Sequence, residues 1–394
     1  MISAPRIDDR RTKRPASFLQ RLVHNPRKLF LRRVLFQIHL WAGIFIALYV
    51  FIIAITGAVL VFEDEFTATT LPANLNSYNP ARTAPIPDVM SSLLRTCPSC
   101  TVINITTPST AVPAYRLRVT DKNHVSSNFI ADPVTAAIYA QPRDWVEWIH
   151  DLHINLLLGE AHGVQINGVG AVILLILAIT GIVLWWPGLK NWNRGLILSF
   201  RHNWRRINFD AHNAIGFWTL FIVTWWAISG IYFAWYRQVV SAVNFVSPLH
   251  GMLSPSLPPL APEHAARASL ESVLAAAQQA SPHGRLFALS DPSLTTPVVY
   301  AQMDLRAPGD FSHRDIVTID SQSAHVLTVW HYGQNHSLGD WLIWSMHPLH
   351  FGTLWGMPFK IMWFLLGVGL ALLSITGLLM YWNRYLRHRI VSAD

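Results

Sequence analysis

The sequence has few cysteines and few charged residues for its length. Only two of its 394 residues are cysteine, so the chain cannot hold a protein-ligated iron–sulfur cluster, which needs about four thiolates. Charged residues make up 13% of the chain, whereas soluble domains have roughly 25%. Because 52% of the residues are hydrophobic, we expect much of the surface to face lipid.

Four apolar segments are long enough to cross a bilayer, which takes about 20 residues. They lie at roughly 35–62, 168–186, 212–236 and 359–382. The first segment is too long for a cleaved signal peptide and has no small-residue cleavage pattern, so we expect it to remain as a signal anchor. The sequence therefore predicts an α-helical integral membrane protein with four transmembrane helices.

The net charge of +8 comes mainly from three segments. Residues 1–33 contain ten Lys and Arg, residues 187–208 contain five without one Asp or Glu, and the tail after residue 382 contains three. These segments fall on one side of the membrane if the chain crosses it four times. The positive-inside rule then places both termini and the short middle loop in the cytoplasm. We expect these basic segments to lie next to the lipid bilayer and not to bind nucleic acid.

The two cysteines, Cys97 and Cys100, form a C-x-x-C motif in the first external segment. The motif follows a helix-like stretch and precedes a strand-like one, which is the reverse of the order in thioredoxin-like proteins. We favour a small structural disulfide in an oxidising compartment, with a redox-active pair as the alternative.

The two halves of the chain repeat the same residues in the same order. In each half, the first apolar segment has a histidine with glycines 4 and 18 positions later: His39, Gly43 and Gly57, then His212, Gly216 and Gly230. The second part of each half repeats Trp-x-x-Trp, His-x-x-His, a glycine and an Ile-Thr-Gly motif, with one residue inserted in the second copy. We interpret the chain as a duplication.

The external segments predict two small α+β modules. Each has a helix-like stretch, alternating strand-like runs and a final strand pair whose turn contains an aspartate, Asp132 or Asp320, that closes the turn by hydrogen bonds. The predicted boundaries are a basic cytoplasmic N-terminus (1–33), helix 1 (34–62), module 1 (63–145), a surface helix with helix 2 (146–186), a cytoplasmic loop (187–208), helix 3 (209–236), module 2 (237–340), a surface helix with helix 4 (341–383) and a cytoplasmic tail (384–394).

The repeated histidines are candidate metal ligands. His39 and His212 enter the membrane from the same side, so a two-fold axis would bring them to one depth on opposite faces of a metal. The second set precedes helices 2 and 4, where a spacing of three puts both members on one helix face: His150 and His153, and His347 and His350. These residues could serve a second metal near the outer surface.

Haem iron and zinc are the two metals that this pattern allows. Zinc usually takes Cys or carboxylate ligands with His in a compact site, whereas axial haem ligation needs one nitrogen from each side of a wide apolar slot. Aromatics and glycines along the apolar segments favour the slot, so we prefer haem. His153 and His350 are the preferred outer ligands, because the same interval separates each from a glycine. His150 and His347 are alternative ligands or support them.

Two further histidines, His331 and His336, lie just before the last external helix. They are either part of a substrate surface or solvated loop residues.

These motifs together resemble the PepSY-associated transmembrane family, iron-regulated inner-membrane proteins whose members include siderophore-iron reductases. The resemblance is carried by the His39 to Gly57 unit, the Leu-His-x5-Gly units ending at Gly159 and Gly356, the Ile-Thr-Gly motifs and the aspartate turns. It covers nearly all of residues 34–383. The second turn has Ser321 where the first has Pro133.

The resemblance implies four membrane helices, PepSY-like periplasmic modules and two b-type haems. It also implies reduction of a ferric siderophore, which releases ferrous iron. The predicted cytoplasmic segments are too short for a flavin or nicotinamide domain, and no G-x-G-x-x-G follows a strand-like segment, so electrons must come from a separate reductase or from membrane quinol. The alternatives are a siderophore or metal permease and a non-enzymatic scaffold whose modules bind a periplasmic partner.

Overall fold

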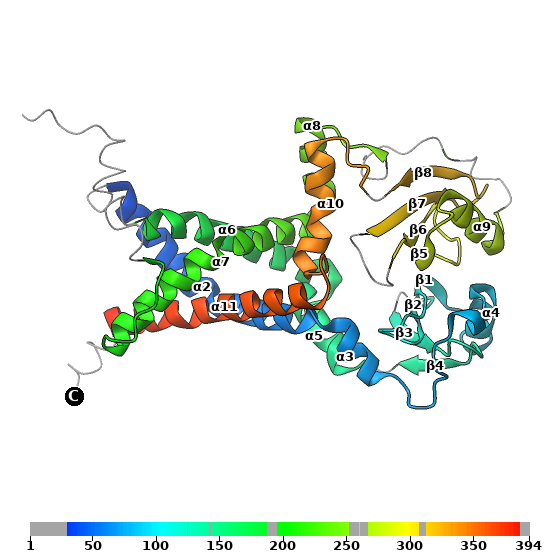
Figure 1. The fold of residues 1–394 in the computed structure, drawn as a ribbon, viewed down its shortest axis with the longest axis horizontal. Helices are drawn as coiled ribbons and strands as arrows, with labels where there is room; N and C mark the ends of the chain where they lie inside the picture. Colours follow the sequence, from blue (N-terminus) through cyan, green and yellow to red (C-terminus); the bar gives the residue numbers. More distant parts are fainter. Residues whose placement is uncertain are drawn as a thin grey trace, which may run out of the picture.

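Four long helices form one antiparallel bundle in the computed structural model of the chain (Figure 1). The structure describes residues 30–123, 125–141, 143–186, 195–251, 260, 267–306, 313–331 and 333–386. The bundle helices are α2 (Phe30–Leu60), α6 (Glu160–Trp185), α7 (Trp204–Ala234) and α11 (Met357–Tyr381), which continues as a short π-helix, η6 (Trp382–Leu386). All four are long and apolar enough to cross a membrane, which confirms the prediction of four spanning helices.

The predicted basic N-terminus, cytoplasmic loop and tail lie in part outside the described residues, which leave out 1–29, 187–194 and 387–394. The start of α2 and the end of α11 lie at one end of the bundle, here called the termini end, and the β-sheet lies beyond the other, the sheet end (Figure 1).

Small residues face the inside of the bundle and large apolar residues face outward. The buried residues include Ala54, Ala178 and Ala371, whereas Phe45 and Phe221 are 81% and 74% exposed. In lipid, helices associate through close packing of small residues rather than through a hydrophobic effect, and large apolar side chains are well solvated by acyl chains. This distribution therefore fits a bundle whose outer surface faces lipid.

Shorter helices surround the sheet end of the bundle. They are α3 (Glu63–Thr70), α5 (Trp145–Asn155), α8 (Tyr236–Val246) and α10 (Leu338–Phe351). Helix α10 runs across the bundle axis rather than along it (Figure 1). The turns into the bundle helices pass through Gly159 and Gly356, whose φ angles of 81° and 69° favour glycine. Each turn thus redirects the chain from a surface helix into a bundle helix.

The external segments form one eight-stranded antiparallel sheet. Its strands are β1 (Thr101–Thr106), β2 (Tyr115–Thr120), β3 (Ser126–Ala131), β4 (Ile138–Gln141), β5 (Arg285–Ser290), β6 (Val298–Asp304), β7 (Arg314–Asp320) and β8 (Val326–Trp330), in the order β4-β3-β2-β1-β5-β6-β7-β8. Strands β1 and β5 pair through Ile105 and Leu289. The two predicted modules therefore share a sheet.

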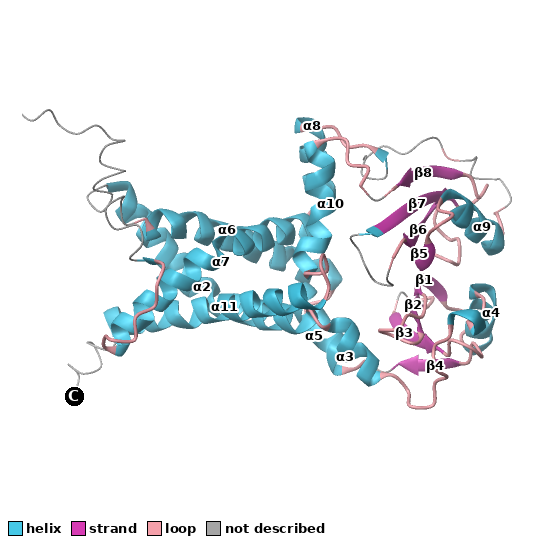
Figure 2. Cartoon of the chain, viewed as in Figure 1, coloured by secondary structure: helices cyan, strands magenta, loops and turns pink. Residues whose placement is uncertain are grey.

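Two helices, α4 (Ile86–Thr96) and α9 (Leu270–Ala280), cover the face of the sheet that points away from the bundle (Figure 2). Their apolar sides, which include Leu93 and Val273, pack with the buried strand residues in one core. A 3-10 turn, η2 (Pro80–Arg82), precedes α4. Cys97 and Cys100 are joined by a disulfide at the end of α4. The other face of the sheet is directed toward α10 and the bundle (Figure 2).

Polar contacts tie the sheet to the helices at the sheet end. Arg116 of β2 lies 3.6 Å from Asp64 of α3, and the Asn128 side chain of β3 donates to Glu147 of α5 at 2.7 Å. On the other side, the rings of Trp330 in β8 and Trp344 in α10 have centres 6.5 Å apart. Both halves of the sheet thus contact helices that adjoin the bundle.

Candidate functional site

The first candidate site lies between α2 and α7, toward the termini end of the bundle. The rings of His39 and His212 have centres 6.5 Å apart, and their planes are nearly perpendicular at 88°. His39 Nδ1 lies 2.9 Å from the hydroxyl of Thr180 in α6, and His212 Nδ1 lies 2.9 Å from the hydroxyl of Thr376 in α11. We call His39 and His212 the inner pair.

The second candidate site lies at the sheet end, between α5 and α10. The rings of His153 and His350 have centres 6.3 Å apart with planes inclined at 60°. His153 Nδ1 lies 3.0 Å from the hydroxyl of Thr56 in α2, and His350 Nδ1 lies 2.7 Å from the hydroxyl of Ser229 in α7. We call His153 and His350 the outer pair. Every one of the four histidines therefore meets a hydroxyl through the same ring nitrogen.

The hydroxyl contacts favour one tautomer of each histidine ring. Each hydroxyl donates its own hydrogen to the backbone carbonyl four residues earlier, at 2.7–2.8 Å. A hydroxyl has one hydrogen, so its oxygen must accept from the histidine Nδ1–H. The Nε2 atom then carries the lone pair, which is the form of imidazole that binds a metal. The bundle thus prepares all four rings for ligation through Nε2.

The separation of the rings matches two ligands on opposite sides of one ion. A metal–imidazole bond of about 2 Å puts the ring centre about 3.2 Å from the metal, so two opposed rings have centres about 6.4 Å apart. The observed values are 6.5 Å for the inner pair and 6.3 Å for the outer pair. Both separations fit axial ligation of a haem iron.

Glycines lie next to three of the four histidine rings, and at Gly57 the ring leaves no room for a Cβ. A Cβ added to Gly57 would lie 2.8 Å from Cε1 of His153, and Cβ atoms at Gly181 and Gly377 would lie 3.4 and 3.5 Å from Cε1 of the inner rings. Each of these glycines follows the threonine that accepts from the same histidine. The threonine of each pair therefore contacts the ring, and Gly57 also leaves the space that the His153 ring needs. Gly230, after Ser229, instead faces Ala171.

A cavity of about 1560 Å³ surrounds the inner pair. This is larger than the ~300–1,000 Å³ of a typical small-molecule pocket. Its wall includes four glycines and flat aromatic rings: Gly43, Gly181, Gly216, Gly377, Phe217 and Trp185. Arginines from the ends of α2, α7 and η6 also line it: Arg32, Arg33, Arg205, Arg206 and Arg384. The cavity combines an apolar slot with a cationic rim, which suits a flat macrocycle that has carboxylate substituents.

Comparison with known families assigns the chain. The model of the PepSY-associated TM region matches residues 36–384, which include both histidine pairs and the sheet. The chain belongs to the PepSY-associated transmembrane family. This confirms the resemblance drawn from the sequence motifs. No curated protein matches the chain.

The other histidines of the two His-x-x-His motifs occupy different surroundings in this PepSY-associated protein. The ring of His347 stacks on Phe351 with centres 4.6 Å apart and lies 5.4 Å from the ring of Phe233. His150 is partly buried on α5. The structure thus brings His153 and His350 together and gives His347 an aromatic environment one helical turn away.

The two loop histidines, His331 and His336, lie between β8 and α10 in the chain. His331 Nδ1 lies 3.1 Å from Asp315 Oδ2. The ring of His336 lies 5.7 Å from that of His250, a residue that the sequence motifs did not single out. Both loop histidines are therefore close to the sheet end but belong to neither histidine pair.

The zinc alternative receives no support at the inner or the outer histidine pair. Among the described residues there is no group of three or more His, Cys, Asp and Glu side chains that could hold a metal ion. Structural and catalytic zinc sites usually have three or four protein ligands, whereas axial ligation of haem needs two.

The sequence motifs did not reveal the role of the hydroxyl groups. Thr56, Thr180, Ser229 and Thr376 each precede a glycine of the repeated motif, and that recurrence was the available signal. The histidines that these hydroxyls contact lie 97–164 residues away in the sequence. No local sequence pattern could therefore predict which hydroxyl meets which histidine.

Proposed function

We propose that this protein carries two b-type haems and transfers electrons across the bacterial inner membrane to a ferric siderophore. The observation that carries the proposal is the set of four histidines whose Nε2 atoms are prepared for ligation and whose rings are 6.3–6.5 Å apart in two pairs. His39 and His212 would hold one haem, and His153 and His350 the other. A haem with two axial histidines supplies a one-electron centre without an open coordination position.

The chain places the two pairs at different depths of the bundle. Helix α2 carries His39 of the inner site and Thr56 of the outer site, and α7 carries His212 and Ser229 in the same way. Each spacing is 17 residues, a rise of about 25 Å at 1.5 Å per residue. Because the hydrocarbon core is about 30 Å thick, the two sites together span most of it. This arrangement supports transfer along the bundle axis.

The side chains around the inner pair would stabilise and orient the cofactor. Arg33, Arg205 and Arg384 line the termini end of the cavity and would pair with carboxylate substituents, since guanidinium groups bind carboxylates with two parallel hydrogen bonds. Arg206 pairs with Asp210, and Arg32 donates to backbone carbonyls at the end of α6. The apolar wall would keep water from the haem ring. An added charge on the haem would therefore cost more free energy than in water. The Thr180 and Thr376 hydroxyls would hold the inner imidazoles in their ligating tautomer.

The direction of transfer follows from the charge of the cytoplasmic segments. The basic N-terminus, middle loop and tail adjoin in sequence the helix ends at the termini end, which we assign to the cytoplasm by the positive-inside rule. The sheet would then lie in the periplasm as two fused PepSY-like modules. A cytoplasmic reductase or membrane quinol would be the donor, and His331 and His336 would belong to the surface that meets the substrate.

The proposed reaction is a single electron transfer to Fe(III) held by siderophore oxygens. Hard carboxylate, hydroxamate or catecholate oxygens bind the more highly charged Fe(III) much more tightly than Fe(II), so one electron weakens the complex. The iron is reduced, the donor is oxidised, and the chelator is released intact as its oxygens take up protons from water. No bond within the siderophore needs to break.

Haem content and reduction kinetics test this proposal. Purified protein should bind two haems per chain, show a Soret band and give two waves in a redox titration. His39→Ala and His153→Ala should each remove one wave. Chemically reduced protein should be reoxidised by a ferric hydroxamate siderophore, with Fe(II) trapped by a ferrous-specific chelator. Absence of a Soret band in wild-type protein supplied with haemin would overturn the proposal.

A further inference from the structure

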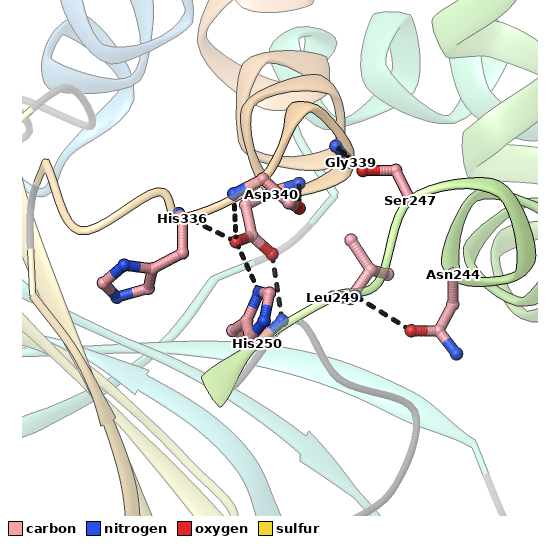
Figure 3. A network of polar contacts seen from close by, with 8 residues as sticks. Asn244, Ser247, Leu249, His250, His336, Gly339 and Asp340 are labelled. Atoms are coloured by element: carbon pink, nitrogen blue, oxygen red, sulfur yellow. Dashed lines mark hydrogen bonds and ion pairs between the residues drawn. The ribbon is translucent and has the colours of Figure 1, made fainter.

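A polar cluster at the start of α10 lies outside both histidine pairs (Figure 3). Asp340, which is 1% exposed, accepts backbone N–H groups of His250 and His336 at 2.9 Å and of Ser337 at 3.0 Å. Its Oδ2 also lies 3.0 Å from His250 Nδ1. The carboxylate thus joins the segment that follows α8 to the segment that precedes α10.

Asp340 determines the tautomer of His250. Burial raises the pKa of Asp340, but the hydrogen bonds from His250, His336 and Ser337 outweigh burial and lower this pKa below its ordinary value. An ionised carboxylate only accepts hydrogen bonds, so His250 Nδ1 carries a proton. When the ring is neutral, its lone pair is then on Nε2. The side chain of His250 is 50% exposed.

The ring of His336 lies beside that of His250. The ring centres are 5.7 Å apart and the planes are inclined at 75°. Figure 3 shows the two rings next to each other beside the first turn of α10. With ring centres about 3.2 Å from a shared ion, this separation corresponds to an angle near 120° at the metal. The geometry therefore differs from that of the inner and outer pairs, which fit opposed ligands.

We propose that His250 and His336 bind a divalent first-row transition-metal ion, with Asp340 as the carboxylate that orients His250. Imidazole nitrogens suit Fe(II), Zn(II), Cu(II) and Ni(II), and a carboxylate behind a ligating histidine is a recurrent arrangement at metal sites. The described residues contain no third such ligand close enough to form a larger group. The ion therefore keeps positions for water or for donor atoms of another molecule.

This metal site is independent of the proposed electron transfer, because binding a divalent ion needs neither haem nor an electron donor. If the proposed function holds, the ferrous ion released from a siderophore on the sheet side is an occupant of matching chemistry. Fe(II) accepts imidazole ligands more readily than the harder Fe(III), which the siderophore oxygens retain. The site would then receive the product of the reaction rather than its substrate.

Equilibrium dialysis of the purified full-length protein against Zn²⁺ tests the site, because zinc is redox-inactive and is absent from haem. Wild-type protein should bind one more zinc ion per chain than His250→Ala or His336→Ala. Asp340→Asn should keep the ligands but bind about 10–100-fold more weakly. Dialysis against Fe²⁺ without oxygen should rank the wild type and the variants in the same order of metal binding.

His283→Ala is the matched control, since His283 is an exposed histidine in the turn before β5. It should bind as many ions as the wild type. His250→Gln and His336→Gln, which keep a polar side chain, repeat the test if an alanine variant loses its helical circular dichroism. Unchanged zinc binding in the His250 and His336 variants overturns the site, and so does a loss in only one of them. A missing Soret band would overturn the proposed function and leave the zinc count unaffected.

Discussion

At the scale of single residues, each of the four candidate histidine ligands contacts a hydroxyl group through Nδ1. Each histidine Nδ1 lies within hydrogen-bond distance of a Ser or Thr hydroxyl on a bundle helix. Each hydroxyl can donate to its own helix backbone, and its oxygen then accepts from Nδ1–H. A lone hydroxyl in a membrane helix normally satisfies itself on the backbone in this way. Its remaining lone pairs make it a suitable acceptor for an imidazole that must keep Nε2 unprotonated. Replacing the hydroxyl should therefore affect the ligand more than the fold.

The first prediction concerns Thr180. Thr180→Val keeps the volume of the side chain but removes the acceptor for His39 Nδ1. Loss of such a partner typically weakens metal binding about 10–100-fold, so one of the two redox waves should shift and the haem of that pair should bind more weakly. A redox titration followed by visible spectroscopy measures both.

Thr219→Val is the control for this prediction. Thr219 lines the same cavity, and its hydroxyl donates to the Ile215 carbonyl of its own helix. It should leave both waves in place. Two unchanged waves in Thr180→Val would contradict the role given to the hydroxyl.

The second prediction concerns Gly57. A Cβ at this position would lie 2.8 Å from the His153 ring, so Gly57→Ala must displace the ring. We expect the protein to lose about one haem per chain, measured by the pyridine haemochrome absorbance. Gly43→Ala, whose Cβ would meet Leu177 at an ordinary 3.8 Å and not the His153 ring, should retain the haem of the outer pair. Equal haem content in the two variants would show that the outer ring tolerates the methyl group.

At the scale of elements, aspartate turns close the two halves of the sheet. Asp132 accepts the backbone N–H groups of Val134 and Thr135, and Asp320 accepts those of Gln322 and Ser323. These contacts confirm the turn chemistry expected from the sequence. Asp132 also accepts from the Asn76 backbone at 2.7 Å, which fixes the segment that leads into α4.

The third prediction concerns the acid sensitivity of this turn. Burial raises the pKa of Asp132, but hydrogen bonds from Asn76, Thr135 and Val134 outweigh it and lower the pKa to about 2, from an ordinary value of 3.8. A depressed carboxylate pKa stabilises the fold above about pH 4, and this stability is lost as the pH falls toward 2. Thermal unfolding followed by circular dichroism between pH 2 and 6 measures the loss.

Asp132→Ala should lower the free energy of unfolding of the sheet by about 2–3 kcal/mol near neutral pH, since hydrogen bonds to a charged acceptor contribute about 1.5–3 kcal/mol each and are not additive. The variant should also show a smaller decrease between pH 4 and 2. An identical pH dependence in wild type and variant would exclude Asp132 as the responsible group.

At the scale of the whole molecule, the pairing of β1 with β5 makes one sheet from two distant segments. The ladder joins Asn104 to Ser290 and Ile105 to Leu289. In the sequence, the bundle helices α6 and α7 come between these two strands. Helices α5 and α10 then carry the outer histidines between this sheet and the bundle. A single sheet therefore holds both supporting helices in one relative position, which the outer pair requires.

The fourth prediction concerns the orientation of the molecule in the membrane. Alkaline phosphatase fused after Gln141 should be active, because this site is predicted to be periplasmic, and green fluorescent protein fused after Arg384 should fluoresce. The opposite pattern would reverse the proposed direction of electron transfer. A matched fusion after Phe62 should report the same side as the fusion after Gln141, since no spanning helix lies between them among the described residues.

The sequence by itself determined the features that depend on local composition. Four runs of apolar residues are long enough to span a bilayer in any fold, and the spacing of His39, Gly43 and Gly57 is readable without neighbours. The aspartate turns and the C-x-x-C motif are local as well. Membership of the PepSY-associated family follows from the same order of motifs.

Tertiary structure decided which groups meet. Whether His150 or His153 faces the other half depends on how α5 and α10 cross the bundle, and packing brings His153 to His350. The hydroxyl acceptors, the β1–β5 ladder and the His250–His336 pair all join residues far apart in sequence. Such contacts are selected by packing of whole helices and strands, because local propensity acts over only a few residues and carries no information about distant partners.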